Sequence, residues 1–202
     1  MKARGKRKTQ DPCQVCGLHK NLCICTWIPR LNLRTKIVLV IHHKELRRTT
    51  NSGQLAVHAL SNSEVFIRGQ DRSKLDLSKI LIPEYQTFLF YPDPEALPLT
   101  SEFVQNQKRP LQLIIPDGNW RQASKVASRH PELKDIPRVM IKKPNLATQH
   151  LRRETSSIGM STLQAIAEAL GIIEGPDVGN ALMNLYEKKL EHTLKGRPQI
   201  SR

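Results

Sequence analysis

Residues 113–123 read LIIPDGNWRQA, an apolar run that ends in Asp117, Gly118 and Trp120. A short apolar run bounded by turn residues predicts a strand buried on both faces, followed by a sharp turn and a helix. In an open α/β sheet, such a strand delivers the residues after it to the ligand crevice, so we expect Asp117 in a binding site. Its carboxylate can cap the following helix, or it can act as a base or an orienting acceptor.

Three other segments repeat this pattern of an apolar run followed by polar or turn residues. Residues 37–41 run into His42, residues 88–90 into Tyr91 and Pro92, and residues 138–141 into Lys142 and Lys143. Between such runs, amphipathic stretches predict helices over residues 52–59, 119–128, 162–170 and 178–192. This alternation indicates an α/β fold with a parallel sheet. No glycine-rich dinucleotide turn follows the first strand, which disfavours an ordinary dinucleotide-binding fold.

Gly171, Gly175 and Gly179 lie between the last two predicted helices or close to them. Because glycine is conformationally permissive, we expect these residues to loosen the connection to the last helix.

The charge of the chain is strongly positive. Its 202 residues include 32 Lys and Arg against 18 Asp and Glu, a formal net charge of +14. Such a surface favours a polyanionic partner, because neutralised phosphates release condensed counterions; a merely soluble basic protein is the alternative. The basic residues near the N-terminus predict a disordered basic arm over residues 1–10. No apolar run is long enough for a membrane span, so we expect a cytoplasmic protein with no membrane partner.

Four cysteines, Cys13, Cys16, Cys23 and Cys25, lie within thirteen residues. In a reducing compartment they are poor candidates for disulfides. A Cys-x-x-Cys pair followed by a second close pair supplies the four sulfur ligands that structural zinc prefers. Residues 11–30 also hold too few large apolar side chains to fold unaided, so we predict a small zinc module there, with an iron–sulfur cluster as the alternative.

Several motifs of the chain occur together, in the same order, in one known family. The matching segments are Asp117-Gly118-x-Trp120-x-x-Ala123, His42-x-x-Glu45-x-x-Arg48-x-Thr50-Asn51-Ser52-Gly53, and Ser161-Thr162-Leu163-Gln164-Ala165. With the cysteines, they resemble the DTW-domain family of tRNA-uridine aminocarboxypropyltransferases. The chain departs from the usual family pattern at three positions. Asn119 stands where the family usually has Thr, His43 where it commonly has Pro, and Gln164 where it usually has Glu.

The resemblance implies a SPOUT-like, knotted α/β domain over residues 31–202, behind the zinc module. It also implies transfer of the aminocarboxypropyl group of S-adenosylmethionine to a ring nitrogen of a tRNA uridine, with release of methylthioadenosine. Asp117 is the candidate catalytic base, although a carboxylate near the sulfonium could instead act electrostatically. S-adenosylmethionine is then a co-substrate, and tRNA is the partner.

Two further sets of residues complete the predicted site. Donor-binding roles are expected for Thr50, Asn51, Ser52, Gly53, Tyr91, Pro92, Gly118, Ser161, Thr162 and Leu163. Contacts with substrate or RNA are expected for His42, Arg48, Trp120, Arg121, Lys142, Lys143, Arg152 and Arg153. For the turn at residues 50–53, an ordinary helix cap is the alternative role. For Trp120, filling the core is favoured over stacking on a flipped uridine.

Two other functions fit parts of the sequence. A SPOUT-type RNA methyltransferase would share the donor, the fold and the basic surface. A non-catalytic zinc-containing RNA-binding protein would share the charge and the cysteines, although only 4% of the residues are aromatic, which leaves few platforms for base stacking. No motif indicates an obligate protein partner, and we expect a monomer.

Overall fold

The computed structural model describes residues 11–69, 75–142, 151 and 159–196. Six parallel strands form one sheet in the order β2-β1-β5-β3-β6-β4, which confirms the predicted α/β class with a parallel sheet. The strands are β1 (Lys36–His42), β2 (Ser63–Arg68), β3 (Gln86–Phe90), β4 (Leu97–Pro98), β5 (Leu111–Asp117) and β6 (Arg138–Met140). The helices are α1 (Gly53–Ala59), α2 (Ser101–Gln105), α3 (Trp120–Arg129), α4 (Thr162–Ile173) and α5 (Pro176–Lys195). The predicted basic arm, residues 1–10, lies outside the described residues.

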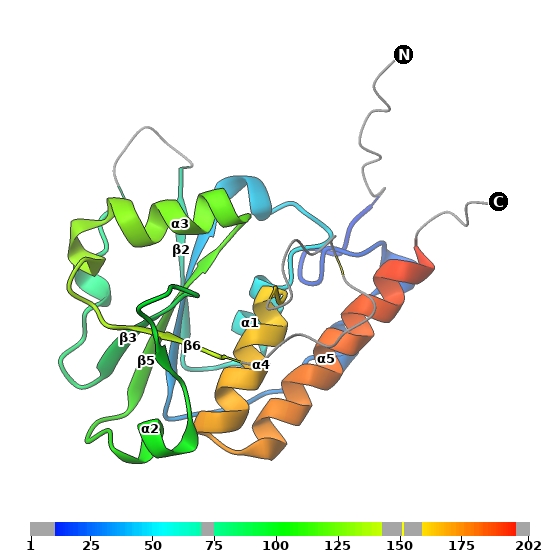
Figure 1. The fold of residues 1–202 in the computed structure, drawn as a ribbon. Coiled ribbons are helices and arrows are strands. Elements are labelled where there is room, and N and C mark those ends of the chain that lie inside the picture. Colours follow the sequence, from blue (N-terminus) through cyan, green and yellow to red (C-terminus); the bar gives the residue numbers. More distant parts are fainter. Residues whose placement is uncertain (1–10, 70–74, 143–150, 152–158, 197–202) are drawn as a thin grey trace.

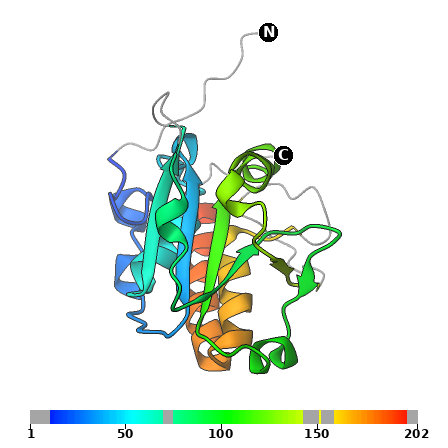
Figure 2. The same ribbon diagram turned by 90° about the vertical axis from the view of Figure 1, so that its left-hand side faces the viewer.

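Helices cover both faces of the sheet, as its apolar strands require. Successive side chains of a strand point to opposite faces. Ile37, Leu39 and Ile41 of β1 therefore pack in a cluster that includes residues of α1, α4 and α5. Val38 and Val40 pack in a second cluster with residues of β5 and α3. Figure 1 shows α3 on one side of the sheet and α4 and α5 on the other, and Figure 2 shows α4 and α5 behind the strands.

Strand β2 was not predicted, although it contains the short apolar run Val65-Phe66-Ile67. It lies at the edge of the sheet and pairs only with β1 among the described strands. Val65 and Ile67 are 36% and 38% exposed. Its three apolar residues are flanked by Glu64 and Arg68, and none of its residues is fully buried, so the signal of a doubly buried strand is weak. The short elements β4 and α2 were also not predicted.

The expectation for the glycines near the last helix was wrong. Gly171 lies inside α4 and Gly179 inside α5, at a close contact between the two helices. A Cβ atom on Gly179 would come within 2.8 Å of the Gly171 Cα atom. Gly175 makes the turn between the helices with a φ of 111°. These glycines allow a close helix contact rather than a loose link.

The cysteine-containing segment packs directly on α5. Cys16, Leu18 and Ile24 are buried in the same cluster as the strands and helices of the main domain. The Nζ atom of Lys189, on α5, donates a hydrogen bond to the Cys16 carbonyl oxygen at 2.5 Å. This segment and the sheet therefore share one hydrophobic core.

Within the described part of the chain, no helix combines the length and the apolar character that a membrane crossing would need.

Candidate active site

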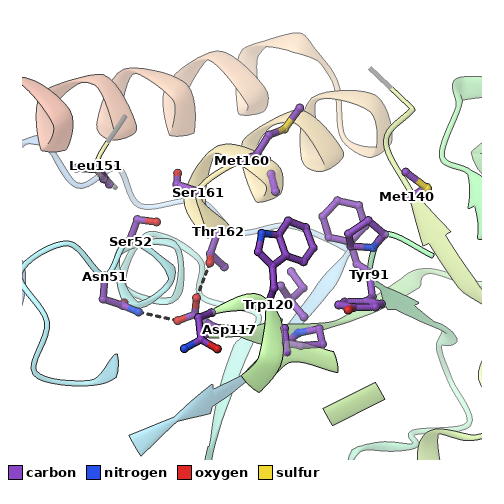
Figure 3. A pocket seen from close by; sticks show the side chains of 18 of the residues that line it. Asn51, Ser52, Tyr91, Asp117, Trp120, Met140, Leu151, Met160, Ser161 and Thr162 are labelled. Atoms are coloured by element: carbon purple, nitrogen blue, oxygen red, sulfur yellow. Dashed lines mark hydrogen bonds between the residues drawn. The ribbon is translucent and has the colours of Figure 1, made fainter. Parts of the chain in front are cut away.

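A cavity of about 330 Å³ opens at the carboxyl ends of the central strands. This is the edge at which open α/β sheets bind ligands, and the volume falls in the range of small-molecule sites. The ends of strands β5, β3 and β6, the turn before α1, and the first turns of α3 and α4 surround it (Figure 3). The lining residues are Thr50, Asn51, Ser52, Phe90, Tyr91, Pro92, Ile115, Pro116, Asp117, Gly118, Asn119, Trp120, Ala123, Met140, Ile141, Leu151, Met160, Ser161, Thr162 and Ala165.

Asp117 lies at the polar end of this cavity. Its side chain is 5% exposed and is held from two sides (Figure 3). Asn51 Nδ2 donates to Asp117 Oδ2 at 2.6 Å, and the Thr162 hydroxyl donates to Asp117 Oδ1. Two residues far from Asp117 in the sequence, Asn51 and Thr162, thus fix the position of its carboxylate.

The turn before α1 is connected to the start of α4. Asn51 Oδ1 accepts a hydrogen bond from the Gln54 backbone N–H at 3.2 Å, so the same side chain that bonds Asp117 also satisfies an N–H group in the first turn of α1. Ser52 Oγ accepts a hydrogen bond from the Leu163 backbone N–H at 3.2 Å. Asn51 therefore stabilises the start of α1 and also forms part of the site.

Two glycines permit close packing beside Asp117. A Cβ atom on Gly53 would lie 2.9 Å from Asp117 Oδ2 and 3.1 Å from its Cγ. A Cβ atom on Gly118 would lie 2.9 Å from Gln122 Cβ. Gly53 and Leu163 do not line the cavity, and both support residues that do.

Helix α3 is capped by Asn119, not by Asp117. The Asn119 side chain accepts a hydrogen bond from the Gln122 N–H at 2.9 Å, and the Gln122 side chain accepts one from the Asn119 N–H at 2.8 Å. This reciprocal pair is a capping box. Asp117 therefore does not cap this helix, and the predicted alternative that it would do so was wrong. Its side chain lines the cavity instead.

The sequence favoured a core position for Trp120, and this prediction was wrong. Its side chain is 44% exposed and lies at the cavity (Figure 3). A large aromatic ring that lines a cavity and also faces solvent is available for stacking with a ligand.

The other end of the cavity is apolar. Phe90, Tyr91 and Pro92 come from the end of β3, and Met140 and Ile141 from the end of β6. Burial and the nearby Asp93 raise the pKa of the Tyr91 phenol, so its hydroxyl is neutral at physiological pH. A ligand that matches the whole cavity therefore has one polar end and one flat or apolar end.

Four of the predicted RNA or substrate residues are described but do not line the cavity. His42 stacks on His43, and its Nδ1 accepts a hydrogen bond from the Lys44 backbone. Arg48 forms an ion pair with the buried Glu45 at 3.2 Å. Arg121 and Lys142 are exposed. Lys143, Arg152 and Arg153 lie outside the described residues.

Some residues of the cavity were missed by the sequence reasoning. Ile115, Met140 and Ile141 belong to predicted strands, and their position at the carboxyl ends was a usable signal. Leu151, Met160 and Ala165 carry no such signal, because their place depends on how distant segments pack.

The four cysteine sulfurs form a compact cluster. All lie within 4.8 Å of one another, and three pairs are separated by 3.5, 3.6 and 3.8 Å. Four sulfurs bound to one zinc at about 2.3 Å would lie about 3.8 Å apart. The donor set and its geometry therefore fit a structural metal site with four cysteine ligands.

The surroundings of the cluster shift the pKa values of its cysteines in opposite directions. Backbone N–H groups of Cys16 and Val15 lower the pKa of the Cys13 thiol to about 6. Lys189 is buried beside the cluster; burial lowers the pKa of its ammonium group to about 8, while the cysteines oppose this shift. Burial raises the pKa values of Cys16 and Cys25.

Comparisons with known proteins give one family model and several similar proteins. A family model described as the DTW domain matches residues 10–194. The chain is 25% identical over 182 residues to a Drosophila melanogaster protein named tRNA-uridine aminocarboxypropyltransferase 2, covering 86% of this chain and 71% of that protein. Proteins of the same name from Macaca fascicularis and Mus musculus are 23% and 24% identical, over 83% and 80% of this chain. The chain spans only 58% and 56% of these two relatives. No solved structure gives a significant match.

Proposed function

The chain belongs to the DTW domain family, and from this premise we propose that it is a tRNA-modifying transferase. The proposed reaction moves the aminocarboxypropyl group of S-adenosylmethionine to a ring nitrogen of a tRNA uridine. The names of three relatives support the substrate and the group transferred. The observation that carries the proposal is the cavity with Asp117 buried at its polar end and Trp120 at its surface.

The proposed reaction exchanges one bond for another. The uridine nitrogen attacks the chain carbon next to the sulfonium, so a C–N bond forms and a C–S bond breaks. The electron pair of the broken bond stays on sulfur, which leaves neutral methylthioadenosine. The proton of the uridine N–H group must leave, and a positioned base contributes about 10²- to 10⁴-fold to such steps. Alignment of the two reactants supplies much of the rest.

We assign to Asp117 the role of the base, or of the acceptor that orients the uridine. The hydrogen bonds from Asn51 and Thr162 fix its carboxylate at the cavity wall, which is the preorganisation that catalysis needs. An electrostatic role beside the positively charged sulfonium would use the same position.

The two ends of the cavity suggest how the donor is held. The apolar end formed by Tyr91, Pro92 and Met140 suits the adenine ring. Thr50, Ser161 and the backbone around Gly118 offer polar groups for the ribose or for the amino acid part of the donor. Arg48 is engaged with Glu45 and does not line the cavity, so we assign it to RNA contacts rather than to the donor.

The proposal extends to the fold, the metal and the partner. The parallel sheet with a site at its carboxyl edge supports a SPOUT-like assignment; a knot would involve the connection between β6 and α4, much of which lies outside the described residues. The sulfur geometry supports zinc, held by Cys13, Cys16, Cys23 and Cys25. Reduced thiols suit the cytoplasm, and the net charge of +14 suits tRNA.

A SPOUT-type methyltransferase and a non-catalytic RNA-binding protein are the competing functions. The product formed from S-adenosylmethionine, when the protein is incubated with this donor and unmodified tRNA, distinguishes these two functions from the proposed one. Methylthioadenosine formed only in the presence of tRNA is the expected result. S-adenosylhomocysteine would indicate methyl transfer instead, and neither product would indicate a binding protein.

The same assay tests the assignment of Asp117. Asp117→Asn keeps the size of the side chain and should lower turnover about 10²- to 10⁴-fold, with donor affinity by calorimetry within a few fold. Asp135→Asn, at an exposed acid, is the matched control. Full turnover in Asp117→Asn would remove this residue from the mechanism.

A further inference from the structure

Helix α3 carries a row of basic residues that the cavity does not use. Arg121, Lys125 and Arg129 are spaced four residues apart, so they lie on one side of the helix over about 12 Å. Arg121 and Arg129 are exposed, and Lys125 is partly exposed. The ten residues of α3 include no acid. The helix therefore presents positive charge along its outer side.

Arg68 extends this row at the end of α3. It is the last residue of β2, and its Nε donates a hydrogen bond at 3.3 Å to Nε2 of His130, the residue that caps the C-terminus of α3. Burial and Arg129 lower the pKa of Arg68. Arg121 and Arg129 lower the pKa of Lys125 in the same way. Like charges have thus been brought together on this surface.

These four residues differ from other basic residues of the protein. Lys188 and Lys195 both pair with Glu191, Lys36 pairs with Glu64, and Arg138 pairs with Asp93. Across the described ranges, Arg68, Arg121, Lys125 and Arg129 form no ion pair with an acidic side chain. Glu132, close to this end of α3 in the sequence, has its Oε2 atom 3.9 Å from His130 Nδ1. Unneutralised positive charge in a row favours a polyanion.

The position of the row relates it to the cavity. Trp120 begins α3 and lines the cavity, and Arg121 follows it directly. The other end of α3, at His130, lies beside the end of β2, because Arg68 bonds His130 there. A nucleic acid backbone lying along α3 would bring one of its nucleotides to Trp120.

We infer that Arg68, Arg121, Lys125 and Arg129 form a phosphate-binding track that holds the backbone of the substrate RNA next to the cavity. This inference rests on the proposed function and names the surface that the tRNA occupies. Phosphate contacts fix the position of a nucleic acid without reading its sequence. The track would thus place a target nucleotide at Trp120, while other features select it.

The test measures tRNA affinity over a range of salt concentrations for the double variant Lys125→Gln, Arg129→Gln. Neither residue lines the cavity. The dissociation constant should rise roughly tenfold at low salt, and the slope of log affinity against log salt should fall by about two, one for each lost phosphate contact. KM for tRNA should rise, while kcat at saturating tRNA and donor affinity stay unchanged.

Two further variants make the result specific. Lys188→Gln, Lys195→Gln removes the same charge from residues that are paired with Glu191 and should leave the slope unchanged. Lys125→Arg, Arg129→Lys keeps the charge and should bind like the unaltered protein. An unchanged slope in the first double variant, with transfer activity intact, would overturn the track alone. Absence of transfer by the unaltered protein would instead overturn the proposed function.

Discussion

Asp117 and Gly53 lie so close together that the identity of one constrains the position of the other. The carboxylate is held by Asn51 and Thr162 on two sides and faces the Cα atom of Gly53 on a third. A side chain at position 53 would have to displace Asp117, Leu39 or the start of α1. At the scale of single residues, the site therefore depends on glycine at position 53, which has no side chain, as well as on the polar groups of Asn51 and Thr162.

We expect Gly53→Ala to lower turnover by about 100-fold, because a displacement of about 1 Å in a reacting group can cost this much. Donor affinity and the folded circular dichroism spectrum should change little. His58→Ala, on the exposed side of the same helix, should retain full turnover. Equal turnover in Gly53→Ala and the unaltered protein would show that the position of Asp117 is not critical.

The second prediction at this scale concerns His42. Burial, and then the positive charge of His43 and Arg68, lower the pKa of its imidazole below the ordinary value of 6.5. The unfolded chain therefore binds this proton more tightly than the folded protein does, so His42 should reduce stability as the pH falls below about 6.5.

Denaturant unfolding between pH 5 and 8 measures this effect. In His42→Gln, the loss of stability toward acid should be smaller than in the unaltered protein. His58→Gln, at an exposed histidine, provides the comparison. A larger acid loss in His42→Gln would mean that the protonated imidazole is stabilised by the fold.

The elements of the fold were predictable to different degrees. Continuous apolar runs identified the strands that are buried on both faces, and amphipathic stretches identified α3 and α4. Strand β2 escaped prediction because it is an exposed edge strand. Asn51 and Asp117 are 66 positions apart, and Asp117 and Thr162 are 45 apart. A sequence pattern can predict that such residues lie at one edge of a sheet. It cannot predict the hydrogen bonds between them, because these depend on packing and register.

Helices α4 and α5 provide a prediction about packing. Gly179→Ala would place a Cβ atom 2.8 Å from the Gly171 Cα atom and 3.1 Å from the Ala167 carbonyl oxygen. Overpacking of this kind costs about 1–3 kcal/mol, and the higher helix propensity of alanine returns up to about 1 kcal/mol. We expect a net loss of about 1–2 kcal/mol in the free energy of unfolding.

Asn184→Ala, on the exposed side of α5, gives the matched comparison for that measurement and should cause no loss. If Gly179→Ala were as stable as the unaltered protein, the two helices would have room to separate, and the glycines would not be required for their contact.

At the scale of the whole molecule, the cysteine segment connects the proposed metal site, the core and the candidate active site. Cys16, Leu18 and Ile24 are part of the main core, and Lys189 bonds to the Cys16 carbonyl. A Cβ atom on Gly17 would lie 3.8 Å from the Cα atom of Thr49, just before the turn that carries Asn51 and Ser52. Disorder in this segment would therefore reach both the core and the cavity.

We expect removal of the metal to lower the melting temperature of the whole protein in one cooperative transition, because the segment has no core of its own. Donor affinity should fall as well. Elemental analysis of the unaltered protein should find one metal ion per chain, and Cys16→Ser should reduce that content. Unchanged metal content in Cys16→Ser, or a main transition indifferent to a strong chelator, would contradict a structural site with four cysteine ligands.

The central claim is the transfer of the aminocarboxypropyl group to tRNA. The most direct measurement incubates the protein with unmodified tRNA and S-adenosylmethionine labelled either on the methyl group or on the aminocarboxypropyl chain, followed by nucleoside analysis. We predict that label from the chain alone reaches the RNA, and that it is found on uridine. Label from the methyl group, or no label from either donor on several tRNA pools, would contradict the claim.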